Sequence, residues 1–551
     1  MSIQGLVRRA RIERQPLLLA VGKDGSVREA TDNDEDVVEV AAERDMLPVP
    51  HDSPMRTWGA FSLAGYWVAE AFGISQYQVA SSAVQAGLSP GATIGAVLLG
   101  HFVVSLGCAV TGYIGCTYGI NFPSLARTSF GVRGTYLAVI CRAVAAIVWF
   151  GTQTYQGGQC VQVMLQAIWP SFKHFPNHLP ESAHVTSSML LCFFVFYFIQ
   201  LPLLWIHISK LKYLFAIVVM PIFGFALFGW AVGRAHGFGP VFSKPTKILD
   251  GRPAGVVFMS AFSSAIGPKA TLALNICDFT RYGKNGKVVI WTNILSLTIA
   301  VTLCAILGVV VTSATEVIYG VSTWSPLQVS SLMGSRAAQF FTAVPWALAV
   351  LATNISANST AVGNDLMVML PRYINIRRGQ YITAVLGLVT CPWIIQSTAK
   401  TFTSFLGGYT VFLAPLGGVI MSEYMLVHHR RIAVPDLFMQ KRSVYWYTGG
   451  WNWRAVLAFV CGIAPCLPGF IRTINPKLGI PVQTTYIYVA AYPVGVITAG
   501  GLYYLFSIVF PPAPLPTTYD FTVRQKGTPG LDDMSSEKEK ELSIDSAVVA
   551  V

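Results

Sequence analysis

Apolar residues dominate twelve stretches of the chain, which are separated by shorter polar loops. Most of these stretches reach the roughly 20 residues that a helix needs to cross the hydrocarbon core of a bilayer. The pattern therefore predicts an all-α polytopic membrane protein with 12 transmembrane helices. The predicted spans lie at about 59–83, 91–114, 135–166, 187–208, 213–233, 254–278, 288–312, 338–368, 380–398, 401–426, 455–471 and 484–510.

The composition agrees with a membrane protein. Of the 551 residues 53% are hydrophobic and only 12% are charged, and the mean hydropathy is +0.54. A soluble domain carries about 25% charged residues. The net charge of +12 sits mainly in the tails and short loops, as expected of residues that set topology, so we predict no nucleic-acid partner.

The residue pattern also excludes several kinds of chemistry. The 10 cysteines lie almost entirely inside apolar stretches, without the spacing of metal ligands or of paired loop cysteines. No order of serine, histidine and aspartate and no phosphate-binding glycine loop occurs in a suitable context. We predict no enzyme activity, no metal and no cofactor.

The two ends of the chain are polar and charged. We predict a largely disordered cytoplasmic N-terminal tail at 1–56, a transporter core with helices 1–10 at 57–426, helices 11–12 at 427–510, and a cytoplasmic C-terminal tail at 511–551. An even number of spans places both tails on one side. The loops on that side carry more Lys and Arg, which favours the cytoplasm. Lys538 and Lys540 in the acidic C-terminal tail suggest ubiquitination and endocytosis.

Two predicted spans carry helix-breaking residues near their centres. In span one, Glu70 precedes the sequence Ala-Phe-Gly-Ile-Ser-Gln, and in span six Gly267 and Pro268 precede Lys269. Such residues are tolerated in a membrane where the freed backbone lines a cavity or finds protein partners. Interruptions five spans apart indicate an inverted-repeat transporter with its site at the breaks. Two kinked helices without a site are the alternative.

Polar side chains recur in pairs at helical spacing in spans three and eight. Trp149 and Gln153 share one helix face, as do Asn354 and Asn358. An indole ring beside amide donors and acceptors suits a flat heterocycle with N–H and C=O groups. The alternatives are an interfacial Trp149 and amides that only bond neighbouring helices.

Ionisable residues inside the predicted spans need polar surroundings. Lys269 must face a polar cavity, pair with an acid or lose its proton. Asp365 either serves an inner gate or ends span eight in solvent. Arg142 is predicted to extend toward the cytoplasm, and Asp278 to anchor a loop with Arg281.

Several motifs occur in the order found in one transporter family. They are Tyr118-Gly-Ile-Asn-Phe-Pro-Ser-Leu-Ala-Arg127, Phe130-Gly-Val-Arg-Gly134, Trp149-Phe-Gly-Thr-Gln153, Leu274-Asn-Ile-Cys-Asp-Phe-Thr-Arg-Tyr282 and Thr353-Asn-Ile-Ser-Ala-Asn358. From about Trp58 to Phe510 the chain resembles the nucleobase–cation symporter-1 family. It is most similar to the fungal Fur-type permeases for uracil, allantoin and uric acid, which Gly73-Ile-Ser-Gln-Tyr-Gln-Val-Ala-Ser-Ser82 and Lys269 support.

The resemblance implies a fold and a binding site. The fold is the leucine-transporter type, in which spans one to five and six to ten are inverted repeats and two helices lie outside them. Trp149 would stack on the substrate, Gln153 and Asn358 would hydrogen-bond it, and Phe405 and Leu406 would form a gate. The remaining implied substrate contacts are Ser75, Asn354 and Lys269, of which Lys269 replaces a second stacking Trp of sodium-coupled members.

The resemblance also bears on the coupling ion. Sodium-coupled members supply two adjacent hydroxyls from span eight, where this chain has Ala352 and Thr353. One oxygen ligand is missing, so we predict H⁺ coupling through Lys269, Asp365 or Thr353.

The predicted function is therefore H⁺-coupled symport of uracil, allantoin and/or uric acid across the plasma membrane into the cell, by alternating access. Carriers of thiamine, nicotinamide riboside, cytosine or pyridoxine in the same family, and a non-transporting receptor or channel, are the alternatives.

Overall fold

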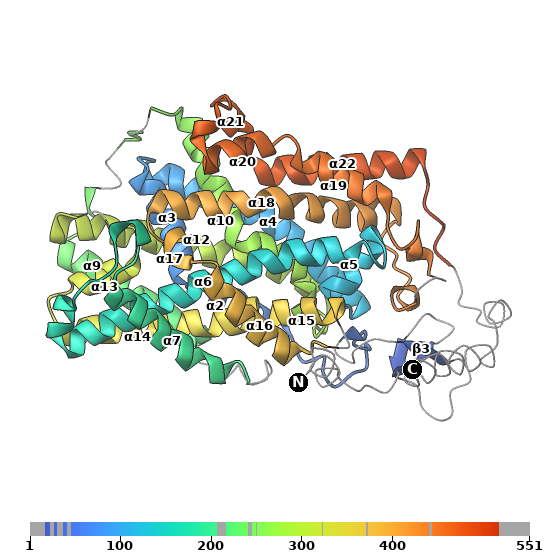
Figure 1. Ribbon diagram of the computed structural model, residues 1–551, viewed down its shortest axis with the longest axis horizontal. Helices are drawn as coiled ribbons and strands as arrows, with labels where there is room; N and C mark the ends of the chain where they lie inside the picture. Colours follow the sequence, from blue (N-terminus) through green and yellow to red (C-terminus); the bar gives the residue numbers. More distant parts are fainter. Residues whose placement is uncertain are drawn as a thin grey trace, which may run out of the picture.

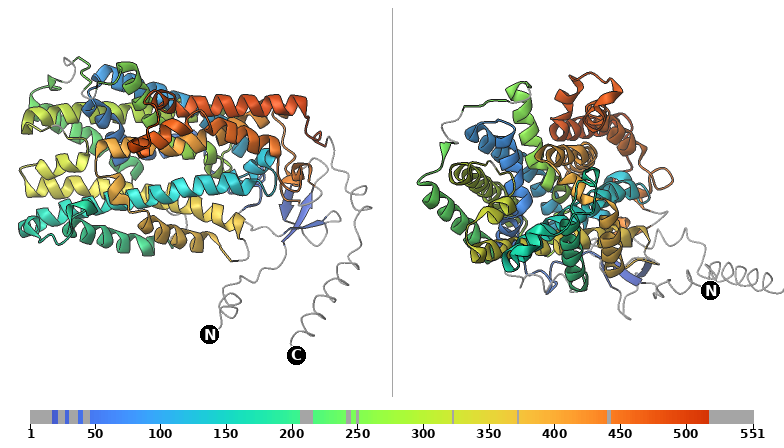
Figure 2. Two further views of the ribbon diagram at one scale, coloured as in Figure 1. Left: turned by 45° about the horizontal axis from the view of Figure 1, so that its top comes forward. Right: turned by 60° about the vertical axis from the view of Figure 1, so that its left-hand side comes forward.

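The computed structural model describes residues 17–21, 27–29, 37–40, 46–205, 216–240, 245–248, 251–321, 323–370, 373–439 and 443–516. Most helices run along one long axis of the molecule (Figures 1 and 2). Helices occupy each of the twelve predicted apolar ranges. Within the described residues, eight helices are long and apolar enough to cross a membrane, or nine if one bent pair forms a single span. The helical, multi-pass architecture of the membrane region is confirmed, and the count of twelve spans stays a prediction.

The helices follow the predicted spans closely. The first six spans contain α2 (Ala60–Ala71) with α3 (Ile74–Gln85), α4 (Pro90–Tyr118), α6 (Thr135–Ile168), α7 (Ser187–Leu203), α9 (Ala216–Ala235) and α10 (Ala254–Asn275). The last six contain α12 (Gly286–Tyr319), α14 (Arg336–Thr353) with the π-helical turn η5 (Asn354–Ser359) and α15 (Thr360–Met369), α16 (Ile376–Val389), α18 (Ala399–Ser422) with the π-helical turn η6 (Glu423–Val427), α19 (Trp453–Ile463) with α20 (Leu467–Ile474), and α21 (Thr484–Tyr488) with α22 (Ala491–Val509).

Short elements connect the spans. The connecting helices are α5 (Phe122–Phe130), α11 (Cys277–Thr280), α13 (Pro326–Leu332) and α17 (Pro392–Ile395). The single-turn elements are η2 (Pro170–His174), η3 (Glu181–Ala183), η7 (Pro435–Leu437), η8 (Val444–Trp446) and η9 (Pro476–Leu478).

The two predicted interruptions turn out differently. Span one is broken as predicted, because α2 ends at Ala71 and α3 begins at Ile74, with Gly73 in an extended conformation. The predicted break in span six is wrong, since α10 runs through Gly267 and Pro268 to Asn275. One missing backbone donor does not end a helix that neighbouring helices hold in place. Gly267 instead permits close packing, because a Cβ there would lie 2.9 Å from the backbone oxygen of Leu406.

Span eight contains a wider turn that its spacing does not reveal. The π-helical turn η5 lies between α14 and α15 and includes both predicted asparagines. The Thr360 hydroxyl donates to the carbonyl of Ile355, five residues earlier, at 2.8 Å. Single π-turns inside α-helices are frequent at functional sites.

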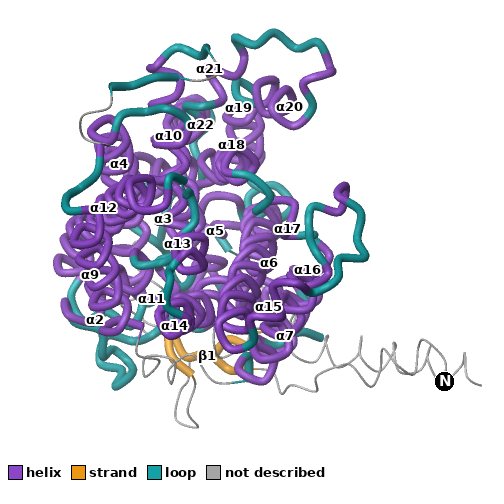
Figure 3. Tube along the Cα trace, turned by 90° about the vertical axis from the view of Figure 1, so that its left-hand side faces the viewer, coloured by secondary structure: helices purple, strands orange, loops and turns teal. Residues whose placement is uncertain are grey.

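The spans pack as two groups of helices. In one group α4 packs against α10 and α12, and α12 also covers α2 and α3. In the other, α6 packs against α7, α14 and α16. Viewed along the helices, the α2, α4 and α12 side and the α6, α7 and α16 side are distinct (Figure 3). Because α3 and α10 face α6 and η5 across this division, residues of both groups can contact one ligand.

The described part of the N-terminal region before residue 46 is a small β-sheet. Strands β1 (Leu17–Val21), β2 (Val27–Glu29) and β3 (Val37–Val40) form an antiparallel sheet in the order β2-β1-β3. The expectation that the tail is largely disordered stays a prediction, because most of residues 1–45 lie outside the described residues. The C-terminal tail from 517 onward, including Lys538 and Lys540, lies outside the described residues.

Residues 46–58, the N-terminal strap, extend across the predicted tail boundary at residue 56 and pack against the helices. Buried Arg56 donates to the carbonyl of Cys116 at 2.7 Å and to that of Gly283 at 3.2 Å. The amide of Val49 donates to the carbonyl of Gly119 at 2.9 Å. Gly119 has φ +67, and a Cβ there would lie 2.3 Å from the Val49 oxygen, so this contact requires glycine. The strap thus ties the start of α2 to the ends of α4 and α11.

Candidate functional site

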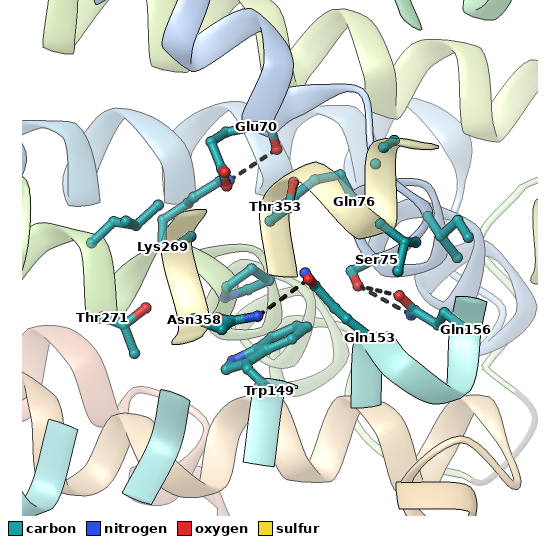
Figure 4. A pocket seen from close by; sticks show the side chains of 17 residues that line it. Glu70, Ser75, Gln76, Trp149, Gln153, Gln156, Lys269, Thr271, Thr353 and Asn358 are labelled. Carbon is teal, nitrogen blue, oxygen red and sulfur yellow. Dashed lines mark hydrogen bonds and ion pairs between the residues drawn. The ribbon is translucent and has the colours of Figure 1, made fainter. Parts of the chain in front are cut away.

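One cavity lies at the break in span one, between the two helix groups (Figure 4). Residues of α2, α3, α6, α10, α14 and η5 line it. The polar lining residues are Glu70, Ser75, Gln76, Trp149, Gln153, Gln156, Lys269, Thr271, Thr353 and Asn358. The remaining ones are Gly73, Ile74, Pro268, Leu272, Ala349, Val350 and Ala357.

The structure brings most of the predicted site residues together. Trp149 and Gln153 stand one turn apart on α6, and Asn358 reaches them from η5 (Figure 4). Ser75 and Lys269, from spans one and six, line the same cavity. Thr353 also lines it, from the end of α14. Residues far apart in the chain therefore form one binding surface.

The amides of Gln153 and Asn358 form a complementary pair. The Asn358 Nδ2 donates to Gln153 Oε1 at 3.2 Å. Within the part of the chain that the structure describes, Gln153 Nε2 and Asn358 Oδ1 make no hydrogen bond to protein. One donor and one acceptor therefore remain for a ligand beside the Trp149 ring.

Aromatic rings of α18 surround Trp149. Its indole Nε1 donates to the Tyr409 hydroxyl at 3.1 Å. The Phe405 and Phe402 ring centroids lie 5.6 and 6.4 Å from that of Trp149, in edge-on contacts. Phe405 therefore lies behind the indole and does not line the cavity. Fully buried Leu406 likewise does not line it, and the gating role of both residues stays a prediction.

Asn354 lies behind the cavity. Its Nδ2 donates to Thr154 Oγ1 and to Gln200 Oε1, each at 3.1 Å, and its Oδ1 accepts from Asn358 at 3.0 Å. The residue is fully buried and does not line the cavity. Asn354 therefore bonds neighbouring helices, as in the alternative that its amide only bonds neighbouring helices. Its bond to Asn358 holds the Asn358 side chain toward the cavity.

Lys269 pairs with an acid. Its Nζ lies 3.3 Å from Glu70 Oε2 and donates to the Glu70 carbonyl at 3.0 Å (Figure 4). Only 1% of Lys269 is exposed. The break after Ala71 leaves carbonyls of α2 without helical partners, and the ammonium binds one of them. Glu70 was missed as a site residue, although an acid in the middle of an apolar stretch is a signal for one.

A second ion pair lies away from the cavity. Arg142 of α6 pairs with Asp365 of α15, and its Nη2 donates to the Ala361 carbonyl at 2.7 Å. Both side chains are fully buried. The predicted extension of Arg142 toward the cytoplasm is wrong, because a buried acid binds it inside the protein, and Asp365 does not end its span in solvent. Asp278 accepts from the Phe122 amide at 2.7 Å and interacts electrostatically with Arg142 and Arg281.

Two further glutamines belong to the site. Gln156, two helical turns after Trp149, donates to Ser75 Oγ at 3.1 Å and to Gln78 Oε1 at 2.9 Å. Gln76 lines the cavity, and within the described residues its buried Oε1 has no partner. The seven-residue spacing of Trp149 and Gln156 was the available signal, since it places both on one face of α6.

Comparisons with known proteins agree with this architecture. Residues 48–495 match the family described as permeases for cytosine/purines, uracil, thiamine and allantoin. The chain is 34% identical to the uracil permease of Saccharomyces cerevisiae, over 82% of this chain and 73% of that protein. It is 32% identical to the allantoin permease of the same yeast, over 86% of this chain and 77% of that protein.

The fold also matches a solved structure. That structure is Mhp1, a nucleobase-cation-symport-1 family transporter, in a closed conformation with bromovinylhydantoin bound. The TM-score is 0.68 at 22% identity, and the match covers 86% of this chain and 97% of Mhp1. The chain is thus a multi-pass membrane permease that belongs to the family of permeases for cytosine/purines, uracil, thiamine and allantoin.

Proposed function

We propose that the chain is an H⁺-coupled symporter that carries uracil, allantoin and/or uric acid across the plasma membrane into the cell, with both termini in the cytoplasm. The single observation that supports this most is the Trp149 ring beside the complementary Gln153 and Asn358 amides in one buried cavity. A flat ring can stack on the indole, while an N–H and a neighbouring C=O meet Asn358 Oδ1 and Gln153 Nε2.

The relatives support the choice of substrate. Those named uracil permease and allantoin permease cover most of this chain. Both named solutes are planar or nearly planar rings with alternating N–H and C=O groups. The edge of such a ring matches an amide pair better than it matches an isolated hydroxyl or charge. The edge and the amide pair each offer one donor and one acceptor.

Two features support coupling to H⁺. Ala352 precedes Thr353 at the end of α14, so one of the two adjacent hydroxyls of sodium-coupled members is absent, and hard cations are held by oxygen ligands. The buried Glu70–Lys269 pair borders the cavity. A proton added to Glu70 releases Lys269 electrostatically, which links protonation to the occupancy of the neighbouring site. Asp365 and Thr353 remain further candidates.

The coupling is tested in proteoliposomes that hold the purified protein. We expect radiolabelled uracil or allantoin to accumulate under an imposed inward H⁺ gradient without Na⁺, and a protonophore to abolish the accumulation. Uptake that requires Na⁺ and ignores the protonophore would refute H⁺ coupling. Competition by unlabelled uracil, allantoin, uric acid, cytosine and thiamine ranks the substrates.

The stacking role has a matched pair of variants on one helix. Trp149→Ala should reduce uptake at least about tenfold at equal amounts in the membrane, because it removes a buried aromatic contact. Trp169→Ala, at the end of the same helix with 59% of the residue exposed, should transport normally. Saturable, wild-type uptake by Trp149→Ala would contradict stacking.

A further inference from the structure

A buried carboxylate lies where α18 ends and does not line the substrate cavity. Glu423 begins the π-helical turn η6 and is 2% exposed. Its Oε1 accepts from the His428 ring at 2.8 Å, and its Oε2 accepts from the Tyr503 hydroxyl of α22 at 2.7 Å. The Tyr447 hydroxyl lies 3.5 Å from Oε1. We call Glu423, His428, Tyr447 and Tyr503 the Glu423 cluster.

The Glu423 cluster joins segments that are otherwise separate. Tyr447 donates to the carbonyl of Thr128 in α5 at 2.6 Å. Tyr503 belongs to the last helix, and the His428 ring also interacts with the backbone of Ala513, in the segment that follows that helix. The end of α18 is therefore held to α5, to α22, to the 428–452 connection and to the start of the C-terminal segment.

The cluster lies at the same end of the molecule as the N-terminal strap. The Tyr118 hydroxyl, in the last turn of α4, donates to the Arg430 carbonyl at 2.7 Å, and the adjacent Gly119 bonds Val49 of the strap. Under the proposed function this end faces the cytoplasm. His428 is partly exposed there, so cytoplasmic protons can reach it.

The surroundings of His428 raise its pKa. Burial alone lowers the pKa of His428, but the hydrogen bond and charge of Glu423, with the Ala513 backbone, outweigh burial and raise it. A raised histidine pKa means that the ion pair is present at acidic pH and is lost as the pH rises through that pKa. Besides its four members, the titratable or charged groups that interact electrostatically with the cluster are Tyr445 and Arg454.

We propose that His428 and Glu423 form a lock that closes when the cytoplasm is acidic: protonated His428 holds the turn after α18 to Glu423, which Tyr503 and Tyr447 connect to α22 and α5, and this slows conformational exchange. This regulation rests on the proposed function, because an H⁺ symporter delivers protons to this face. Continued uptake acidifies the compartment, protonates His428 and limits further cycles.

The lock is tested by counterflow in sealed vesicles of one orientation. Labelled uracil exchanges with unlabelled uracil inside, the external pH is fixed, the potential is clamped, and the pH on the cytoplasmic side is varied from about 6 to about 8. We expect the wild-type exchange rate to rise about three- to tenfold over this range, the effect of losing one charge-assisted hydrogen bond. His428→Gln and Glu423→Gln should each flatten the profile, and every rate is normalised to that variant's own value at the highest pH.

The adjacent histidine supplies the control. His429 is exposed and has φ +48, a conformation that Asn tolerates, so His429→Asn should keep the wild-type profile. A wild-type rate independent of cytoplasmic pH, or an unchanged profile in either folded variant of the pair, would overturn the lock. Counterflow needs no net H⁺ movement. A failure of H⁺ coupling would therefore appear in the gradient experiment and leave the His428-dependent profile in place.

Discussion

Replacing Arg142 by methionine should destabilise the protein strongly without touching the substrate cavity. The change leaves Asp365 fully buried and without its cation, while Asp278 loses a favourable charge nearby. Breaking a buried pair by removing one partner costs about 3–5 kcal/mol. Total stabilities are about 5–15 kcal/mol, and about 1.4 kcal/mol is a factor of ten. The unfolded fraction should rise by roughly two to three and a half orders of magnitude.

Substituting the acid of the pair, Asp365, should destabilise the protein less than Arg142→Met does. Asp365→Asn keeps the side-chain volume, and Arg142 still donates to the Ala361 carbonyl and stays near Asp278. The loss is then that of one charged hydrogen bond, about 1–3 kcal/mol. The double variant Arg142→Met with Asp365→Leu removes both charges and should recover much of the stability that Arg142→Met loses.

Thermal unfolding of the detergent-solubilised protein, followed by size-exclusion fluorescence, ranks the stabilities of Arg142→Met, Asp365→Asn and the double variant. Arg133→Met is the control, because Arg133 is exposed and lies two residues before α6, the helix that carries Arg142. The Arg133→Met variant should melt near the wild-type temperature. A wild-type melting temperature for Arg142→Met, or a double variant no more stable than Arg142→Met, would refute the reasoning that an unpaired buried carboxylate is the cause.

Two further substitutions test the packing around the site. Tyr409→Phe removes the acceptor of the Trp149 indole N–H, so the KM for the solute should rise about three- to tenfold while the protein still folds, as uptake kinetics would show. Gly151→Ala would place a Cβ 2.4 Å from the Gly387 oxygen and should lower the melting temperature, whereas Gly95→Ala, with no atom within 4 Å of its Cβ, should not.

The sequence predicts those parts of the site in which the spacing of residues along one helix determines which side chains are neighbours. Trp149 and Gln153 lie on one helix face by periodicity, and the break at Gly73 follows from residues that disfavour a helix there. Family motifs then place Asn358 beside them. These residues do line one cavity.

Contacts between distant helices could not be read from spacing. Glu70 meets Lys269 across 199 residues, and Tyr409 meets Trp149 across 260, because both pairings depend on which helices become neighbours. Arg142 was misjudged for the same reason, since its acid lies on another span. The π-helical turn at Asn354–Ser359 differs from an α-helix in that its hydrogen bonds span one residue more, a difference that tertiary packing decides.

The N-terminal strap imposes an order on biosynthesis. Arg56 leaves the ribosome early, yet its carbonyl partners at Cys116 and Gly283 follow 60 and 227 residues later. The strap therefore cannot dock until about half of the polypeptide has been translated and α11 has reached its place. Until then the Arg56 guanidinium has neither of these carbonyl partners and stays hydrated.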